Sequence, residues 1–446
     1  MITMPQAIID ETFGEKSLPR EYQKLKETIV SLFDERVWFM TEACASVVAA
    51  LMLEDLSNPI GLNLVDGPSS EKTTVLSFFF DLPHVYRSDS FTPACFVSHA
   101  ANVKTAKLPD VDLLPRIRHK CLVVPELAPV FGADREKLLE NFSILTRVFD
   151  GEGLWRDGGV HGGRGYVGDY HFVWLGATTP IKPYVWKLMG HLGSRLLFLT
   201  VETHRNHRAE VQRALDGLTA DLSYRQKVAK CRSAVKVFFE YLQCVLGQSQ
   251  FARSVSWNRK GENETVLKAI AELADVTARA RSTVSVWRPD DQGGEEDFSM
   301  PIRERPMRLA SLLYGLARGH ALLSGRTRLE VDELPLVVAV SLSSMPDDRR
   351  RVVDLMLSRH HPEKISPFGR VTSSEISKIL GFSAPTARKV LKALSILELG
   401  NLAEGTGPNP LSFELNSDLD WLRSDRFAEH RLKWAEIVER DAGAPF

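Results

Sequence analysis

The first half of the chain alternates short apolar runs with segments in which apolar residues recur every three or four positions. Short continuous apolar runs are typical of strands buried in a parallel sheet, and the segments between them are typical of connecting helices. The predicted strands are Ile60–Val65, Ala94–Val97, Cys121–Val124, His171–Gly176 and Arg195–Val201. The predicted helices between them are Lys72–Phe80, Arg135–Asp150 and Ile181–Met189. The pattern therefore predicts an α/β domain built on a parallel five-stranded sheet.

Apolar residues also recur at helical spacing before and after the predicted α/β domain. Tyr22–Phe33 and Glu42–Leu53 precede it, and each has an apolar face. The predicted helices that follow it are Arg208–Leu246, Glu264–Arg281, Pro306–Leu323 and Glu330–Leu342. The acidic, glycine-containing stretch Arg288–Ser299 is predicted to be a linker between two of these helices.

A separate C-terminal unit begins near Asp347. Its three predicted helices are Arg349–Arg359, Thr372–Leu380 and Ala384–Leu394. Gly381 stands at the bend where a helix-turn-helix needs a small residue. The strands Leu397–Leu402 and Leu411–Leu415 flank a glycine- and proline-containing turn and form a two-stranded ribbon. Three helices and a ribbon describe a winged helix, and Asp418–Val438 is predicted as one more amphipathic helix.

The chain is long enough for more than one core, with 446 residues of which 44% are hydrophobic. The predicted elements divide it into an N-terminal helical segment (1–45), the α/β core (46–205), a helical unit (206–345), the winged helix-turn-helix (346–416) and a C-terminal helix (417–446). The formal net charge of −1 does not exclude nucleic-acid binding, but it requires any basic surface to be local.

Cysteine usage and hydropathy predict a cytoplasmic protein that does not enter a membrane. The five cysteines are scattered and odd in number, and most lie inside apolar runs, as expected of reduced core residues. No apolar run is long enough to span a bilayer. Gln6, Asp10 and Glu11 stand where a secretory signal would be basic and then apolar.

A candidate phosphate-binding loop lies between the first predicted strand and the helix that follows it. In a P-loop, glycines let backbone N–H groups approach the phosphates, a lysine reaches the β- and γ-phosphates, and a hydroxyl binds Mg²⁺. The residues predicted to bind ATP are Gly67, Ser69, Ser70, Lys72, Thr73 and Thr74, with Thr73 also a ligand of Mg²⁺. However, Asp66 and Glu71 occupy the two glycine positions of the usual pattern.

The carboxylate of Glu71 is the more serious departure. Like charges roughly 4 Å apart repel by about 4 kcal/mol at an effective dielectric constant of about 20. Nucleotide binding therefore requires Glu71 to turn away from the phosphates or to pair with Lys72. The alternative interpretation is an ordinary strand–turn–helix with a lysine at the start of the helix.

The order of motifs downstream of this loop resembles the MCM-like group of AAA+ ATPases. A helix at Arg135–Asp150 is followed by a glycine- and arginine-rich hairpin, by a strand that ends in Gly-Ala-Thr-Thr-Pro, and by Ser194-Arg195 at the entry to another strand. The resemblance covers roughly residues 45–345. It implies an AAA+ P-loop core with a helical lid, binding of ATP and Mg²⁺, and assembly of identical chains into a ring or partial ring.

The resemblance also implies catalytic roles. Glu126 is the expected base that activates water, and Thr178 is expected to orient that water. Arg195 is expected to reach the γ-phosphate of the neighbouring subunit, and Arg308 matches the sensor-2 arginine. Pro125 stands where the family has an aspartate for Mg²⁺, which puts hydrolysis in doubt.

Each assignment has a simpler alternative, and a second departure concerns Arg195. Leu196-Leu197 replaces the Phe-Asp that follows this arginine in the family. The alternative interpretation is that Arg195 is an ordinary surface arginine at the entry of a strand. The sequence after the fourth strand also fits a capped helix start with Pro180 in the first turn.

Two surfaces are candidates for DNA binding. The hairpin Leu154–Tyr170 matches the position of the presensor-1 hairpin and carries Arg156 and Arg164, although it also fits a loop that covers the nucleotide. The second surface is the third helix of the winged helix, where recognition helices contact DNA. Its candidate DNA-binding residues are Thr386, Arg388, Lys389 and Lys392. Winged helices also serve as protein-docking modules, so a protein partner is an alternative.

Three functions follow from these patterns. The favoured one is an MCM-like AAA+ ATP-binding protein that acts on DNA as a helicase or remodelling motor, with weak or altered ATP hydrolysis. The second is a winged-helix DNA-binding regulator with a nucleotide-sensing core. The third is an adaptor that recruits another protein. The histidines His204, His207, His360 and His361 have no cysteine or carboxylate at ligand spacing and do not predict a metal site.

Overall fold

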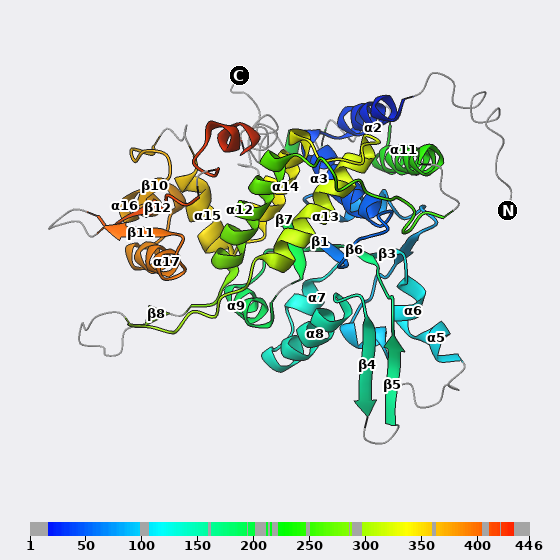
Figure 1. Ribbon diagram of the computed structural model, residues 1–446, viewed down its shortest axis with the longest axis horizontal. Coiled ribbons are helices and arrows are strands. Elements are labelled where there is room, and N and C mark those ends of the chain that lie inside the picture. The colour runs from blue at the N-terminus through cyan, green and yellow to red at the C-terminus, as the bar shows by residue number, and fades with distance from the viewer. Residues whose placement is uncertain are drawn as a thin grey trace.

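The computed structural model describes residues 17–98, 107–158, 162–193, 195–200, 211–212, 215, 222–246, 250–284, 286–287, 297–358, 363–403, 410–419 and 421–431. An α/β core with helices on both faces of its sheet makes up most of the described chain (Figure 1). A smaller unit of helices and short strands, close to the C-terminus in sequence, lies at one end of the molecule. No helix within the described ranges is long and apolar enough to cross a membrane.

Five parallel strands form the central sheet in the order β2–β3–β6–β1–β7. They are β2 (Val85–Arg87), β3 (Cys121–Val124), β6 (Val173–Thr178), β1 (Ile60–Val65) and β7 (Leu196–Thr200). β1 pairs with β6 and β7, and all pairs are parallel. Alternate strand residues enter two hydrophobic clusters, one on each face, as expected of a sheet covered on both sides. The predicted parallel five-stranded sheet is confirmed.

The prediction for the second strand was wrong. Ala94–Val97 does not form a strand, because Pro93–Phe96 is a 3₁₀ helix that buries Phe96. Pro93 has the fixed φ that suits a first helical turn, and a short apolar run alone cannot distinguish a strand from a buried turn of helix. The second strand is instead β2, a three-residue edge strand that is too short to give a periodic pattern.

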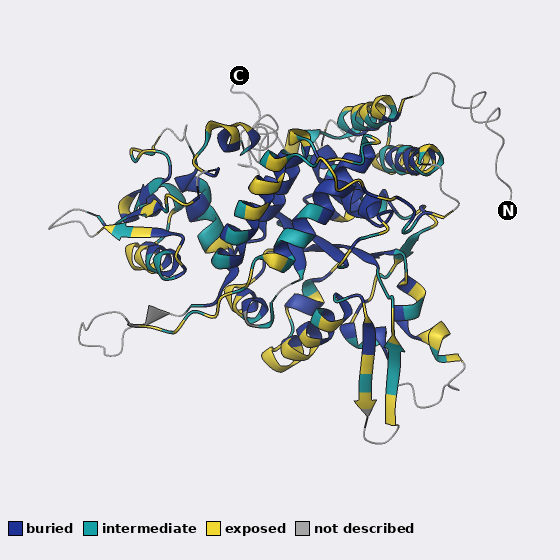
Figure 2. Cartoon of the chain, viewed as in Figure 1, coloured by how far each residue is buried: buried dark blue, intermediate teal, exposed yellow. Residues whose placement is uncertain are grey.

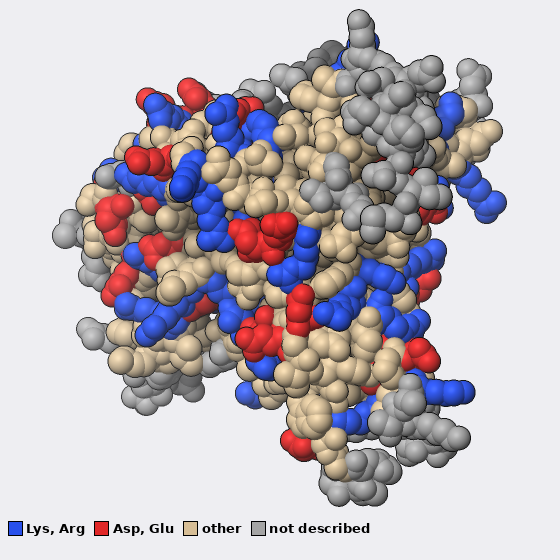
Figure 3. Space-filling model, turned by 45° about the vertical axis from the view of Figure 1, so that its right-hand side comes forward, with Lys and Arg blue, Asp and Glu red and all other residues tan. Residues whose placement is uncertain are grey.

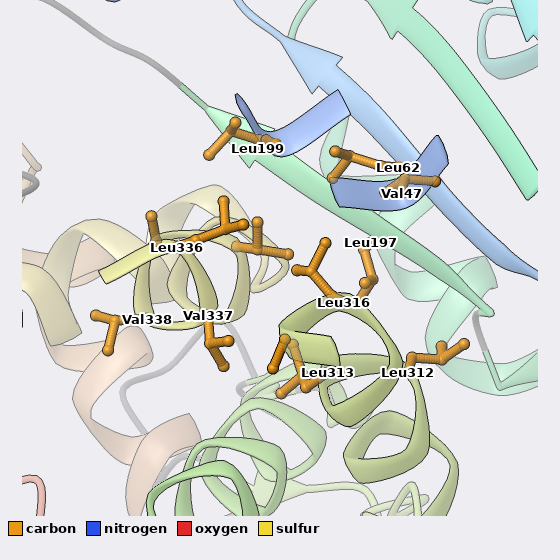
Figure 4. Packing of buried hydrophobic residues seen from close by; sticks show 14 of the residues in the cluster. Val47, Leu62, Leu197, Leu199, Leu312, Leu313, Leu316, Leu336, Val337 and Val338 are labelled. Carbon is orange, nitrogen blue, oxygen red and sulfur yellow. The ribbon is translucent and has the colours of Figure 1, made fainter. Parts of the chain in front are cut away.

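Helices from distant parts of the sequence pack together on one face of the sheet. They are α3 (Glu35–Ala50), α13 (Met307–Leu323) and α14 (Leu334–Ser343). Leu316 of α13 lies next to Leu197 of β7, and Leu313 of α13 and Val337 of α14 belong to the same hydrophobic cluster (Figure 4). These helices are buried along their inner sides (Figure 2). The helical unit is therefore packed directly on the α/β core, and the boundary predicted at residue 45 falls inside α3.

The opposite face is covered by α8 (Arg135–Val148), α9 (Pro183–Leu192) and the short helix α6 (Leu113–Ile117). The described part of the helical unit also contains α11 (Tyr224–Val245) and α12 (Glu264–Arg281). The bounds of α12 agree with the prediction. α11 packs beside α2 (Leu18–Leu32) at the edge of the molecule (Figure 1).

α13 makes a buried ionic contact with the N-terminal helices. His320 lies between Glu42 of α3 (3.5 Å) and Glu333 (3.3 Å), and the hydroxyl of Tyr22 donates to Glu42. Burial alone would lower the pKa of His320, but its hydrogen bonds to Glu333 and Glu42 raise the pKa to about 9. The imidazole is therefore charged at neutral pH and links α13 to α3.

The C-terminal unit follows the order helix, strand, helix, helix, strand, strand. Its elements are α15 (Asp347–Met356), β10 (Arg370–Thr372), α16 (Ser373–Leu380), α17 (Ala384–Ile396), β11 (Gly400–Ala403) and β12 (Ser412–Leu415). The strands form an antiparallel sheet in the order β10–β12–β11, so the prediction of a two-stranded ribbon missed β10. Gly381 follows α16 at φ +69, a left-handed conformation that favours glycine, at the bend between α16 and α17.

Two hairpins leave the body of the molecule. β4 (Gly153–Gly158) and β5 (Gly162–Val167) form the longer one, which projects away from the sheet (Figure 1). β8 (Val286–Trp287) and β9 (Asp297–Phe298) form the second, which extends from the region between α12 and α13 toward α17. The helix predicted to start at Asp418 begins later, because residues 417–419 and 421–424 contain turns and no helical residue, and helical residues start at Asp425.

Candidate functional site

The candidate phosphate loop and two of the predicted catalytic residues meet at one edge of the sheet. β1 and β6 run in register up to Val65↔Thr178, and the backbone N–H of Asp66 donates to the carbonyl of Thr178 (3.4 Å). β3 ends beside β6, and the N–H of Leu127 donates to the carbonyl of Ala177 (2.9 Å). Glu126 therefore lies next to the end of β6. The carboxyl edge of an α/β sheet is where ligands usually bind.

The loop contains two strained residues. Ser69 has φ +61 and Glu71 has φ +64, both in the left-handed region. This conformation costs a residue with a side chain about 1–2 kcal/mol, which is why glycine is favoured there. Glu71 occupies a glycine position of the usual P-loop pattern, so the backbone keeps a conformation that suits glycine although the side chain is a carboxylate.

Lys72 opens α4 (Lys72–Ser77) and is 8% exposed. Its ammonium group donates to the carbonyls of Asp66 (2.9 Å) and Gly67 (2.6 Å) and to the hydroxyl of Ser70 (2.7 Å). The lysine therefore lies inside the curve of the loop. An incoming phosphate would replace one of these acceptors, and the hydroxyl of Ser70 is the one that does not belong to the backbone.

Each of the two loop carboxylates accepts a hydrogen bond from another group. Glu71 accepts a hydrogen bond from the hydroxyl of Tyr224 on α11 (2.7 Å), which also contacts the hydroxyl of Thr74. Burial, together with Glu71, raises the pKa of Tyr224 to about 12. Asp66 accepts from the N–H of Gly67 (2.6 Å). The repulsion expected from Glu71 is thus reduced by a residue that no sequence motif marks, since Tyr224 lies far downstream in another element.

The two predicted catalytic residues at this edge differ in exposure. Thr178 is buried at the end of β6. Glu126 is exposed, and its carboxylate accepts from the N–H of Ala128 (2.8 Å) at the start of α7 (Ala128–Phe131). Pro125 is buried at the end of β3 and supplies no carboxylate. Thr73 is exposed on the first turn of α4. The roles of these residues remain predictions.

Arg195 and Arg308 lie together at the opposite edge of the sheet. β7 starts level with Gly61, near the beginning of β1. The four residue-to-residue steps from Gly61 to Val65 span about 13 Å of strand, and the phosphate loop lies beyond them. Within one chain, therefore, Arg195 does not reach the loop.

Asp150, two residues after the end of α8, contacts both of these arginines. Its Oδ1 accepts from Nε of Arg195 (3.2 Å) and from Nη1 of Arg308 (2.7 Å). Arg195 also donates to the carbonyl of Gly193 (2.7 Å). Burial lowers the pKa of Arg195, which still carries its charge at neutral pH. The sequence offered no signal for Asp150, because an aspartate at the end of a helix is common.

A cavity next to Arg195 does not provide a nucleotide site. It is lined mainly by apolar side chains, among them Phe142, Leu145, Met189 and Leu196, and holds about 10 Å³. Ligand pockets are typically about 300–1,000 Å³ in volume. The cavity is also at the edge opposite Lys72, so the phosphate loop is the better candidate.

The hairpin arginines are engaged with the rest of the chain. Arg164 forms an ion pair with the buried Asp112 (2.9 Å), and Arg156 donates to the carbonyl of Val97 (3.3 Å). Arg156 and Arg164 are cross-strand neighbours. Neither side chain is an unpaired cation. The buried carboxylate of Asp112 requires hydrogen-bond donors, and Arg164 supplies one. His161, which lies between the two strands in the sequence, is outside the described residues.

The candidate recognition helix α17 presents several polar side chains. Thr386, Arg388 and Lys389 are exposed, whereas Lys392 is partly buried. The opposite side of the helix is buried in the unit and includes Val390, Leu391 and Leu394. On the face of the whole molecule shown in Figure 3, charges of both signs are interspersed without a continuous basic area.

Several residues discussed in the sequence analysis lie outside the described part of the chain. They are Ser194, His204, His207, His360 and His361. Among the described residues, no group of three or more His, Cys, Asp or Glu side chains is arranged to hold a metal ion.

Comparisons with known proteins return distant structural similarity. No protein-family model and no curated protein matches the sequence. A proposed ATPase from Cytophaga hutchinsonii has a TM-score of 0.36 and 12% identity, over 73% of this chain and 88% of that one. The apo A form of the NrS-1 C-terminal region has a TM-score of 0.24 and 9% identity, over 90% and 76%. These scores are too low to indicate function.

Proposed function

We propose that this chain is a P-loop ATPase-like protein of the MCM-like AAA+ type that binds ATP with Mg²⁺. The observation that carries the proposal is the position of Lys72, held inside a strand–loop–helix turn at the same sheet edge as Glu126 and Thr178. Lys72 binds the β- and γ-phosphates after giving up the hydroxyl of Ser70.

Magnesium binding is the weaker half of this site. The exposed residue Thr73 would supply the protein ligand through its hydroxyl, and phosphate oxygens and water would supply the remaining ligands, because Pro125 offers no carboxylate. Mg²⁺ commonly keeps several waters when it binds with nucleotide phosphates. Glu126 would accept the proton of the attacking water, and we expect slow hydrolysis because Pro125 leaves the metal without a carboxylate ligand.

The arginines complete the site from a neighbouring copy. Arg195 and Arg308 lie at the edge opposite Lys72, so head-to-tail contact of identical chains brings the two edges together. Their guanidinium groups neutralise the charge that develops during phosphoryl transfer. The proposal therefore includes a homo-oligomer.

A second function is supported by the C-terminal unit. Its element order and three-stranded antiparallel sheet match a winged helix, and Arg388 and Lys389 are exposed on α17. We propose DNA binding through this helix. Docking of a protein partner is the alternative for the same surface.

Calorimetric titration with ATP and Mg²⁺ tests the first proposal. Lys72→Ala should reduce ATP affinity at least tenfold, about 1.4 kcal/mol. Lys230→Ala, which removes an exposed lysine from α11, is the matched control and should leave affinity unchanged. Equal affinity in the wild type and Lys72→Ala would contradict binding at this loop.

A further inference from the structure

Three arginines meet on a single carboxylate at the edge of the sheet opposite Lys72. Asp150 accepts from Arg308 at 2.7 Å, from Arg195 at 3.2 Å and from Arg147 at 3.4 Å. Glu152 pairs with Arg147 (3.3 Å), which leaves Asp150 as the carboxylate shared by Arg195 and Arg308. Positive charge is therefore in excess around Asp150.

The two shared arginines are held in different ways. Arg195 is anchored from the side by the carbonyl of Gly193 and is largely buried. The side chain of Arg308 is 36% exposed, and among the described residues Asp150 is its ion-pair partner. Arg195 is therefore fixed in place, whereas Arg308 can shift to another anion without leaving a buried group unpaired.

Asp150 is ionised in this setting. Burial alone would raise its pKa, but the hydrogen bond from Arg308 and the charge of Arg195 outweigh burial and lower the pKa. The ionised carboxylate offers guanidinium groups the same kind of acceptor as a phosphate does, but with less charge and fewer oxygens.

We propose that Asp150 is an internal substitute for phosphate. It holds Arg195 and Arg308 together as one anion receptor until a phosphate group replaces its carboxylate. The inference rests on the proposed function only for the source of that phosphate, a nucleotide bound to a neighbouring copy. The receptor itself belongs to a single chain. Asp150 is thus a positioning residue, which orders the arginines before the neighbour's nucleotide arrives and competes with that nucleotide for them.

Binding of inorganic tripolyphosphate, measured by calorimetry without Mg²⁺, tests this proposal. All variants carry Lys72→Ala, so that the phosphate loop does not contribute. Asp150→Asn should bind tripolyphosphate at least about tenfold more tightly than the Lys72→Ala parent, because the competing charge is gone. Glu152→Gln is the matched control, since it removes a charge two residues away that contacts Arg147 but neither Arg195 nor Arg308, and it should change affinity less than twofold.

A purely structural role of Asp150 would predict a loss of binding, not a gain. The gain should disappear when Arg195 and Arg308 are both replaced by alanine. The proposal is overturned by an unchanged affinity in folded Asp150→Asn, by an equal gain in Glu152→Gln, or by a gain that survives the double alanine replacement. Thermal unfolding checks folding, and Asp150→Ser enters the same titration if Asp150→Asn does not fold. Failure of the wild type to bind ATP at Lys72 would refute the proposed function but leave this result unchanged.

Discussion

Replacement of Glu71 by glycine should have different effects on the stability of the fold and on the affinity for ATP. Glu71 adopts φ +64, which costs about 1–2 kcal/mol that glycine would recover. The same change removes the hydrogen bond from Tyr224, which contributes about 0.5–1.5 kcal/mol. Because the two effects oppose each other, the free energy of unfolding should change by less than about 1 kcal/mol.

The effect of Glu71→Gly on ATP binding should be larger. With the carboxylate turned toward Tyr224, a separation of roughly 8 Å from the phosphates corresponds to about 2 kcal/mol of repulsion per pair of charges at an effective dielectric constant of about 20. Glu71 is partly exposed, so solvent and salt screen part of this repulsion. We therefore expect ATP to bind about tenfold more tightly to Glu71→Gly.

Two further variants separate charge from conformation in the same calorimetric assay. Glu71→Gln removes the charge, keeps a side chain that can accept from Tyr224, and retains the strained backbone, so it should recover most of the affinity gain. Tyr224→Phe removes the donor that turns Glu71 away and should weaken ATP binding. Weaker binding by Glu71→Gly would refute the reasoning, because it would mean that Glu71 itself is needed for the ligand.

Mixtures of Glu126→Gln and Arg195→Ala chains should hydrolyse more ATP than either variant alone, because hybrid interfaces contain both native groups. If mixtures that assemble and bind nucleotide show no recovery, Arg195 does not act on the nucleotide of a neighbouring chain. Double replacement of Arg388 and Lys389 by alanine should weaken DNA binding and reduce the slope of log affinity against log salt by roughly one unit per lost phosphate contact, whereas an unchanged slope in the folded variant would favour protein docking. In the folded chain the pKa of His320 is about 9, above the ordinary value of about 6.5. The charged imidazole therefore stabilises the fold fully below about pH 6.5, and this stabilisation is lost as the pH rises through 9. Denaturant unfolding should show this loss for the wild type, and a loss of equal size in His320→Gln would contradict it.

The sequence predicted the parts of the fold that local pattern determines. The central strands were found because buried parallel strands are continuous apolar runs, and the bounds of α12 agree because it is long, periodic and capped by Asn263. β2 and β10 were missed because three residues are too few to show a period. Ala94–Val97 was assigned to a strand because its apolar run gives no information on local dihedrals.

The candidate site was predictable only where neighbouring residues in sequence are neighbours in space. Lys72 and its loop follow from a motif. The contact of Glu71 with Tyr224 and the meeting of Arg195 and Arg308 on Asp150 depend on packing between elements far apart in the chain. Asp112 similarly determines the position of Arg164, although nothing in the hairpin sequence indicates an acidic partner.

The most direct test of the central claim is a crystal structure of the chain with Mg²⁺ and a non-hydrolysable ATP analogue. Binding at the predicted loop requires the β- or γ-phosphate to lie within hydrogen-bond distance of Lys72 Nζ, with the hydroxyl of Ser70 displaced from it and Thr73 beside the metal. A nucleotide bound elsewhere, or a loop in which Lys72 keeps its contacts to Asp66, Gly67 and Ser70 at saturating nucleotide, would contradict the claim.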